Sequence, residues 1–365
     1  MEYKRLGDIG TYINGYPFKP EDRGTEGLPI IRIQDLTGNA YDIGFYNGNY
    51  PKRIEINDGD VLISWSASLG VYLWDRGKAL LNQHIFKVVF EKCAVDKQYF
   101  IYAVQHKLKE MESKTHGATM KHIVKKDFDE TVIPFPSLGQ QAEISKTLSK
   151  TANIIAMRQQ QLSALDDLIK ARFVEMFGDP VANTLEWKTA LLREVTSKIG
   201  SGATPRGGKG SYQAEGITLI RSMNVHDGRF EYKDLAHITD EQAAQLNNVS
   251  VEEGDVFINI TGASVARSCI VPKDTLPARV NQHVAIIRCV RNLLNPTFAN
   301  NMFLNDRFKE QLLDIGESGG ATRQAITKQQ LEGLTVILPP MNQQEEFAAF
   351  VAQIDKSKFT TSEVS

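Results

Sequence analysis

Cysteine, long apolar runs and excess charge of either sign are all scarce in this 365-residue chain. Three cysteines, Cys93, Cys269 and Cys289, lie too far apart in sequence to form a disulfide framework or a zinc cluster. A reducing, cytoplasmic setting is therefore expected. No apolar run approaches the roughly 20 residues of a membrane span, and the N-terminus carries no signal-peptide core. We therefore expect neither secretion nor a membrane partner.

The formal net charge is only −2. Whole-chain charge thus gives no support for nucleic-acid binding, and any such surface has to come from local basic patches. Hydrophobic residues make up 42% of the chain, which is enough for globular cores. The length predicts two or three domains.

The chain contains an internal repeat, in which short motifs recur in the same order. The matches are Glu2-Tyr3-Lys4 with Glu186-Trp187-Lys188, Asn14-Gly15 with Ser201-Gly202, Ile31-Arg32 with Ile220-Arg221, Gly59-Asp60-Val61 with Gly254-Asp255-Val256, Asn82-Gln83-His84 with Asn281-Gln282-His283, Gly117-Ala118-Thr119 with Gly320-Ala321-Thr322, Ile123 with Ile326, Pro136 with Pro340, and Gln140-Gln141 with Gln343-Gln344. Each match alone is weak, but their common order makes chance a poor explanation. The sequence therefore predicts two similar globular domains.

Each copy begins with a β-rich part and continues with helices, which predicts an α+β fold class. Short apolar runs at residues 61–63 and 256–258 follow Gly-Asp turns. Further strands are expected at 85–90 and 284–287, helices at about 97–112 and 296–314, and proline-ended strands at 131–136 and 335–340.

A heptad pattern follows the first copy, in a stretch without proline or glycine from residue 140 to residue 177. Its apolar seam consists of Ile144, Leu148, Ile155, Leu162, Leu165, Ile169 and Met176. The seam predicts one helix, about 55 Å long at ~1.5 Å per residue, that packs along a partner helix. Gly178 and Pro180 are expected to end it. Phe347, Val351 and Ile354 repeat the seam after the second copy, so the two helices are expected to pair as an antiparallel coiled coil.

This organisation gives four expected segments. They are a first globular domain at 1–139, a central helical segment at 140–178, a second globular domain at 179–342, and a shortened distal helical segment at 343–365.

Two related domains that alternate with helices resemble the specificity subunit of type I restriction-modification systems. The motifs that carry the resemblance are Gly200 to Pro205, the paired Asn-Gln-His and Gly-Ala-Thr triplets, Pro-x-x-x-Gln-Gln at the start of each helix, and Arg172 to Gly178. The resemblance implies that each domain is a target-recognition domain that reads one half of a split site in double-stranded DNA. It also implies that the helices space the halves and dock methyltransferase subunits, while endonuclease-translocase subunits join the complex. S-adenosylmethionine, ATP and Mg are then expected in the partner subunits and no cofactor in this chain.

Features that both copies share cannot encode two different half-sites, so readout is expected where the copies diverge. The candidates for base readout are Ser64, Ser66, Ser68, Lys121 and His122 in the first copy and Asn259, Thr261, Ser264, Arg323 and Gln324 in the second. The candidates for phosphate contact are Lys114, Lys125, Lys126, Arg206 and Lys209. The alternative is that these residues belong to ordinary loops and to a solvated helix face.

Motifs that suggest catalysis all fail on spacing or composition. Residues 295–298 (Asn-Pro-Thr-Phe) lack the second proline of an adenine-methyltransferase motif and suit a helix start. Residues 202–209 miss the spacing of a phosphate-binding loop. His84 and His283 have no ligand cluster beside them in sequence, so no metal and no catalytic residue are predicted. The alternatives are a stand-alone or regulatory DNA-binding protein and a methyltransferase fused to its own recognition domains.

Overall fold

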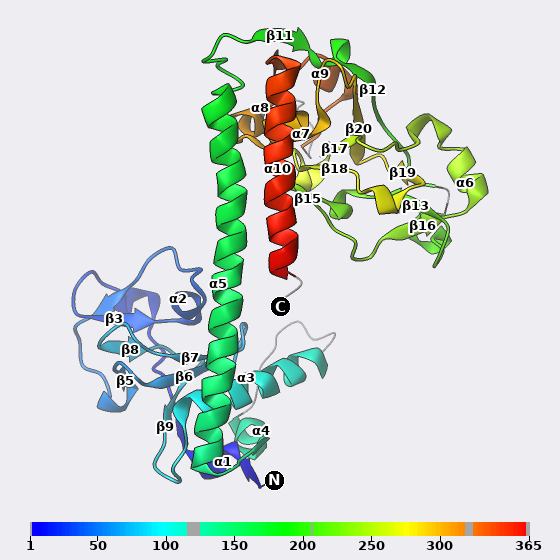
Figure 1. Ribbon diagram of the computed structural model, residues 1–365. Coiled ribbons are helices and arrows are strands. Elements are labelled where there is room, and N and C mark those ends of the chain that lie inside the picture. The colour runs from blue at the N-terminus through cyan, green and yellow to red at the C-terminus, as the bar shows by residue number, and fades with distance from the viewer. Residues whose placement is uncertain (1, 115–124, 206, 318–323, 363–365) are drawn as a thin grey trace. The chain divides into compact units, whose positions relative to one another are not determined.

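The computed structural model describes residues 2–114, 125–205, 207–317 and 324–362. The chain divides into two compact units, Met1–Ala156 and Met157–Ser365, and each is described by itself (Figure 1). The boundary between them falls inside helix α5 (Leu138–Phe177). Both units combine small sheets with helices, so the predicted α+β fold class is confirmed.

The first unit holds a strand pair and two four-stranded sheets. The pair joins β1 (Tyr3–Arg5) to β10 (Val132–Pro134), which brings the two ends of the domain together. One antiparallel sheet has the order β2-β9-β6-β7, with the bounds Thr11–Asn14, Ile85–Val89, Val61–Ser64 and Gly70–Leu73. The other has the order β4-β3-β8-β5, with the bounds Phe45–Tyr46, Leu28–Ile31, Ala79–Leu81 and Glu55–Ile56. Helices α1 to α4 are Leu6–Ile9, Ile33–Thr37, Lys97–Lys114 and Lys125–Glu130.

The second unit holds the same kinds of sheet. Its first pair joins β11 (Lys188–Leu191) to β21 (Thr335–Leu338). The four-stranded sheet has the order β12-β20-β17-β18, with the bounds Thr196–Ser201, Val284–Cys289, Val256–Asn259 and Ser268–Ile270. A smaller sheet has the order β16-β13-β19 (Ala236–Ile238, Ile217–Ile220, Ala278–Val280), and β14 (Val225–His226) pairs with β15 (Arg229–Phe230). Helices α6 to α10 are Asp240–Ala244, Pro296–Leu304, Asp306–Glu317, Lys328–Glu332 and Met341–Ser362.

The repeat seen in the sequence is a repeat of topology. The order β2-β9-β6-β7 in the first unit matches β12-β20-β17-β18 in the second, and β3 runs parallel to β8 as β13 does to β19. The repeat match of Tyr3 with Trp187 is wrong by two residues. Tyr3 lies opposite Pro134 in β1-β10, a position that Thr189 opposite Ile337 holds in β11-β21.

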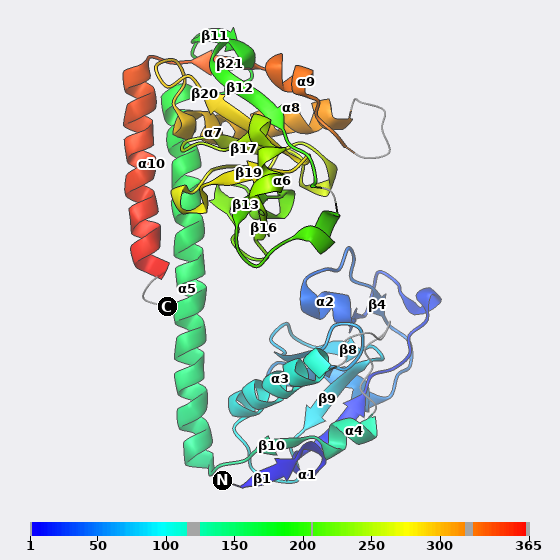
Figure 2. The same cartoon turned by 90° about the vertical axis from the view of Figure 1, so that its right-hand side faces the viewer.

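The central strands are continuous apolar runs because both faces of their sheets are covered. All residues of β6 and of β17 are buried. In β17, Val256 and Ile258 belong to one hydrophobic cluster while Phe257 belongs to another, as the two-residue alternation of a strand requires. Helix α7 packs against β17 and β18 on one side of this sheet (Figure 2).

The helical region predicted at 296–314 is two helices rather than one. It breaks at Asn305, which ends α7 and whose side-chain oxygen accepts the backbone N–H of Arg307 at 3.1 Å to begin α8. An asparagine offers this cap because its short side chain reaches the free N–H groups of the next helix.

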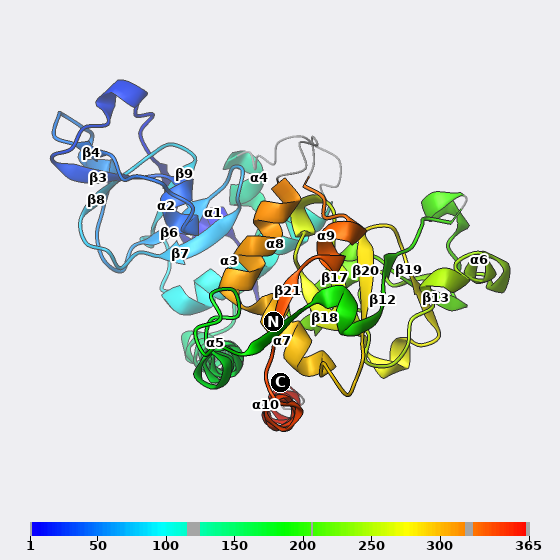
Figure 3. The ribbon, with the colours of Figure 1, turned by 90° about the horizontal axis from the view of Figure 1, so that it is seen from above.

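Helix α5 forms as the heptad pattern predicts, and α10 pairs with its C-terminal part. Ion pairs of 3.1 Å between Arg172 and Glu346 and of 2.7 Å between Asp166 and Lys358 show that the two helices run antiparallel. Figure 3 looks along both helices, which lie side by side. The helix ends at Gly178, which takes a left-handed φ of 72° as the sequence predicts.

The seam is covered over only part of α5. Phe347, Val351 and Ile354 of α10 are buried in one cluster with Ile169 of α5. Leu162, Leu165 and Met176 are half-buried. Ile144, Leu148 and Ile155 are exposed, so the shortened helix α10 leaves this part of the seam uncovered. Among the described residues, no helix has the length and apolar character that a membrane crossing requires.

Candidate nucleic-acid interface

The shared Gly-Asp turn is a scaffold element in both domains. The carboxylates of Asp60 and Asp255 each accept the backbone N–H three residues earlier, at 2.8 Å. Each also pairs with a basic side chain of the neighbouring strand, Asp60 with Lys87 at 3.0 Å and Asp255 with Arg288 at 2.8 Å. The motif therefore fixes the entry into β6 and β17.

The shared Asn-Gln-His turn is held against the parallel strand pair. Asn82 and Asn281 donate their backbone N–H groups at 3.0 Å to the last carbonyl of β3 and of β13. Gly15 and Gly202 pass so close to these turns that a Cβ would lie 2.0 Å and 1.7 Å from a backbone oxygen. Only glycine fits such an approach, which explains why both copies carry it.

The histidines of these turns also have structural surroundings. The imidazole Nδ1 of His283 lies 2.5 Å from the Thr261 hydroxyl, and the His84 ring packs edge-on against Trp65 with centroids 4.9 Å apart. Among the described residues, no three histidines, cysteines or carboxylates gather as metal ligands.

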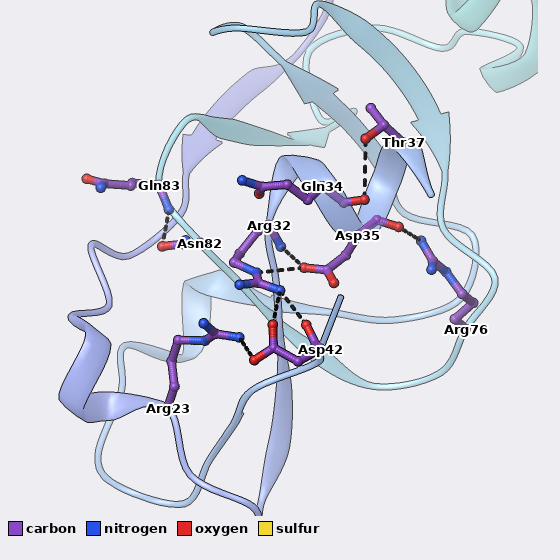
Figure 4. Close-up of polar contacts among 9 residues, drawn as sticks. All are labelled: Arg23, Arg32, Gln34, Asp35, Thr37, Asp42, Arg76, Asn82 and Gln83. Carbon is purple, nitrogen blue, oxygen red and sulfur yellow. Dashed lines mark hydrogen bonds and ion pairs between the residues drawn. The ribbon is translucent and has the colours of Figure 1, made fainter. Parts of the chain in front are cut away.

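Arg32 and its partners Asp35 and Asp42 form a clamp that fixes a turn after β3 (Figure 4). In the sequence, this clamp was visible only as the match of Ile31-Arg32 with Ile220-Arg221. Arg32 donates its backbone N–H and its Nε–H to the Asp35 carboxylate, at 2.8 and 3.1 Å. Its guanidinium also donates to the carbonyl of Asp42. These interactions with Asp35 and Asp42, the Asp35 hydrogen bond foremost, raise the pKa of Arg32. Arg23 holds the other side of Asp42 at 2.8 Å.

The second domain repeats the clamp in part, with Asn224 in the place of Asp35 and Asp234 in the place of Asp42, while the buried Nε of Arg221 has no hydrogen-bond partner among the described residues. The Arg221 N–H donates to the side-chain oxygen of Asn224 at 3.1 Å, and the Arg221 guanidinium donates to the carbonyl of Asp234. At this point each domain has a turn after its matching arginine, an α-helical one at Ile33–Thr37 and a 3-10 one at Ser222–Asn224.

Each turn exposes a different residue at the second position after its arginine. This residue is Gln34 in the first domain and Met223 in the second. Figure 4 shows the Gln34 amide extending away from the clamp. The sequence prediction missed this pair, although both residues stand two positions after the arginine of the Ile-Arg match.

Three of the readout candidates are buried, so the expectation that they are exposed is wrong. Ser64 is fully buried and donates to the carbonyl of Ser68 at 2.5 Å, and Ser66 is buried beside it. Asn259 is fully buried and donates to the carbonyl of Ser222 at 2.9 Å. The Ser64 hydroxyl thus holds a local turn, and the Asn259 amide holds the distant segment at Ser222, as buried polar groups need such partners.

Other readout candidates lie nearer the surface. Ser68 is exposed, while Thr261, Ser264 and Gln324 are half-buried. The structure brings the last three together, because the carbonyl of Gln324 accepts the backbone N–H of Gly262 at 3.0 Å. The Gln324 amide itself donates to Glu317 at 2.7 Å.

Several candidates cannot be located. Lys121, His122, Arg206 and Arg323 lie outside the described residues, as do the side chains of Lys114 and Lys209. Of the remaining phosphate candidates, Lys125 pairs with Asp129 at 2.7 Å and Lys126 is exposed. A role for any of them in DNA contact stays a prediction.

The sequence prediction did not single out two buried glutamines, although the Gln-Gln match contains them. Gln141 of α5 and Gln344 of α10 are 0% and 1% exposed, and each bonds backbone groups of its own domain. The only signal in the sequence was their place just after each proline-ended strand.

The motif at residues 295–298 is a helix start, as predicted. The side-chain oxygen of Asn295 accepts the backbone N–H groups of Thr297 and Phe298 at 2.9 and 3.3 Å. Burial raises the pKa of the Cys269 and Cys289 thiols to about 12, so both stay protonated near neutral pH.

The family model for the type I restriction modification DNA specificity domain matches this chain twice, at residues 1–166 and 185–363. The chain is 22% identical to the EcoBI specificity subunit of Escherichia coli, over 96% of this chain and 78% of that protein. It is 23% identical to the MjaVIII specificity subunit of Methanocaldococcus jannaschii, over 97% and 86% of the two chains.

Solved structures show the same fold. The chain is similar to the crystal structure of the S subunit of a type I restriction-modification system from M. genitalium. That match has a TM-score of 0.57 at 14% identity and covers 99% of this chain and 91% of the other. These two-domain scaffolds, with helices after each domain, define a class of DNA specificity proteins. This chain belongs to the family of type I restriction-modification DNA specificity domains.

Proposed function

We propose that this chain is the sequence-recognition subunit of a type I complex and that each globular domain reads one half of a bipartite site in double-stranded DNA. The observation that carries the proposal is one scaffold displayed twice with different exposed side chains, as at Gln34 and Met223. A glutamine amide pairs with the edge of adenine, whereas a methionine offers apolar contact such as the thymine methyl group. Two domains of the same fold then recognise two different DNA sequences.

The helices space the half-sites and dock methyltransferase subunits, with endonuclease-translocase subunits joining the complex in the cytoplasm. Helix α5 supports this role because it runs for 40 residues and exposes Ile144, Leu148 and Ile155 on one seam. A row of exposed apolar side chains is typical of a protein-protein contact.

Methylation and cleavage belong to the partner subunits, which bring S-adenosylmethionine, ATP and Mg. The assignment is supported by the residues that suggested chemistry in this chain. Asn295 caps α7, Cys269 and Cys289 are buried thiols, and His283 is bonded within a turn.

A domain exchange tests the proposal. Residues 180–340 are replaced by the corresponding domain of a relative, and the variant is expressed with its methyltransferase partner. Sequencing of the methylated adenines should show one half-site changed and the other retained. Alteration of both halves would contradict the assignment of one domain to each half, and methylation by the purified chain alone would contradict its lack of catalysis.

A further inference from the structure

One glutamine at the start of each spacer helix is completely buried. Gln141 lies in the first turns of α5 and Gln344 in the first turns of α10. Glutamine is mostly exposed in proteins, and burying its amide is unfavourable unless both ends are hydrogen-bonded. Two such residues at matching positions therefore point to a shared role.

In the first domain, the amide of Gln141 bridges two backbone segments. Its Oε1 accepts the N–H of Asp96 at 3.0 Å, and its Nε2 donates to the carbonyl of Pro136 at 2.8 Å. Asp96 begins α3, since its carboxylate accepts the N–H of Tyr99 at 2.7 Å. Pro136 lies just beyond β10. One side chain thus joins the spacer helix, the start of α3 and the segment that follows β10.

The second domain repeats this bridge. The Oε1 of Gln344 accepts the N–H of Asn295 at 2.9 Å, and its Nε2 donates to Pro339 at 2.8 Å and to Leu293 at 3.3 Å. Asn295 caps α7 as Asp96 caps α3. The two bridges also show that the repeat match of Pro136 with Pro340 is wrong by one residue. Gln141 donates to Pro136 and Gln344 to Pro339, so Pro136 corresponds to Pro339.

The polar face of α5 carries most of its attachment to the first domain. Between residues 138 and 156, the buried residues of α5 are Gln141 and Ser145, and the half-buried Ser149 lies 3.1 Å from the hydroxyl of Tyr102 in α3. The residues at 141, 145 and 149 share one side of the helix because they are four apart. Hydrogen bonds of Gln141 and Ser149 therefore join this side of the helix to the first domain, while the Ser145 hydroxyl bonds Ala142 of its own helix.

We infer that Gln141 and Gln344 are positioning residues, which lock each reading domain to its spacer helix and thereby keep the gap between the two half-sites constant. The inference rests on the proposed function and extends it. A change of helix direction at either end would move a reading domain along the DNA, and the amide resists this because it holds two backbone segments of that domain at once.

Glutamate variants test this role. Gln141→Glu and Gln344→Glu keep size and acceptor but lose the donor toward the proline carbonyl. The matched controls are Gln140→Glu and Gln343→Glu, one residue earlier on the same helices. Gln140 is exposed and uses its oxygen as an acceptor for the Ser137 N–H at 3.2 Å, which a carboxylate can also do.

Each variant is expressed as the full chain with its methyltransferase partner, and methylated sites are sequenced. The native chain and the controls should methylate sites with one gap length. Gln141→Glu should keep both half-site sequences but lose about ten-fold in discrimination against gaps one base pair longer or shorter, the factor that ~1.4 kcal/mol represents. If both Gln141→Glu and Gln344→Glu discriminate against longer and shorter gaps as well as the native chain does, the inference is overturned.

If a variant does not assemble with the methyltransferase subunit, thermal unfolding of the purified chain still tests the role of the glutamine. Burial raises the pKa of a carboxyl, and a protonated glutamate again has one donor and one acceptor. The deficit of Gln141→Glu relative to Gln140→Glu should therefore shrink as the pH falls from 8 to 5. A deficit independent of pH overturns the bridging role. Failure of the proposed function is separate, because the native chain would then show no bipartite site at all.

Discussion

Gln34 and Met223 stand at matching positions, two residues after Arg32 and Arg221, whose backbone N–H groups bond the side chains of Asp35 and Asn224 in the same way. Around them, the repeated residues Asp60 and Asp255 are engaged within their own domains. The residues that both copies share thus hold the scaffold, and the exposed residues that differ between the copies are available to contact a ligand.

Exchange of this residue should change one half-site. Gln34→Met removes the donor and acceptor that suit adenine, and one good base contact gives about 1–3 kcal/mol of discrimination, so selectivity at one position should fall about 5- to 150-fold. Methylome sequencing should show a degenerate base in one half-site and an unchanged second half-site. The control Gln83→Met alters an exposed glutamine of the shared Asn-Gln-His turn and should leave the site intact. An unaltered site in Gln34→Met would remove this residue from readout.

Helices α5 and α10 show how far a sequence pattern determines structure. The heptad predicted α5 to within two residues at its start, because a stretch without proline or glycine, here residues 140–177, favours a helix as a local property. The extent of pairing was not predictable in this way. Leu148 and Ile169 carry the same signal, but α10 covers only the second.

The same limit applies to the candidate site. The repeat marked the Gly-Asp and Asn-Gln-His turns, which are structural in both copies because both domains need the same turns, while the Gly-Ala-Thr triplets lie outside the described residues. It did not predict that Ser64 and Asn259 are buried, since exposure depends on the tertiary contacts of the turn and not on the residue type. The roles of Gln141 and Gln344 depend on backbone groups about 45–50 residues away in sequence, Asp96 and Asn295, which no local pattern reveals.

Packing between α5 and α10 should dominate the stability of the second unit. Phe347 is 0% exposed, and its ring lies 5.5 Å from those of both Phe173 and Phe177. Phe347→Ala should cost about 3–5 kcal/mol and lower the unfolding midpoint of this unit by about 10 °C. Val174→Ala, at an exposed position of α5, should shift it by less than about 2 °C. Calorimetry that gives equal shifts for both variants would contradict this assignment.

At the scale of the whole molecule, one continuous helix connects the first recognition domain to the second. Residues 150–157 of α5 are exposed on all sides in the described structure. Extra residues can therefore be inserted there without removing a buried contact. This makes the helix a direct test of what sets the distance between half-sites.

Insertion of four helical residues after Ala156 should lengthen the gap between half-sites without altering either half. Four residues add about 6 Å, nearly two base pairs of about 3.4 Å each, and turn the helix about 40° beyond a full turn. Seven residues add about 10.5 Å, or three base pairs, and keep the heptad register. Methylome sequencing should therefore show gaps longer by two and by three base pairs. Co-purification with the methyltransferase subunit establishes that each variant still assembles. An assembled, active complex that retains the native gap in both variants would show that α5 does not measure the distance.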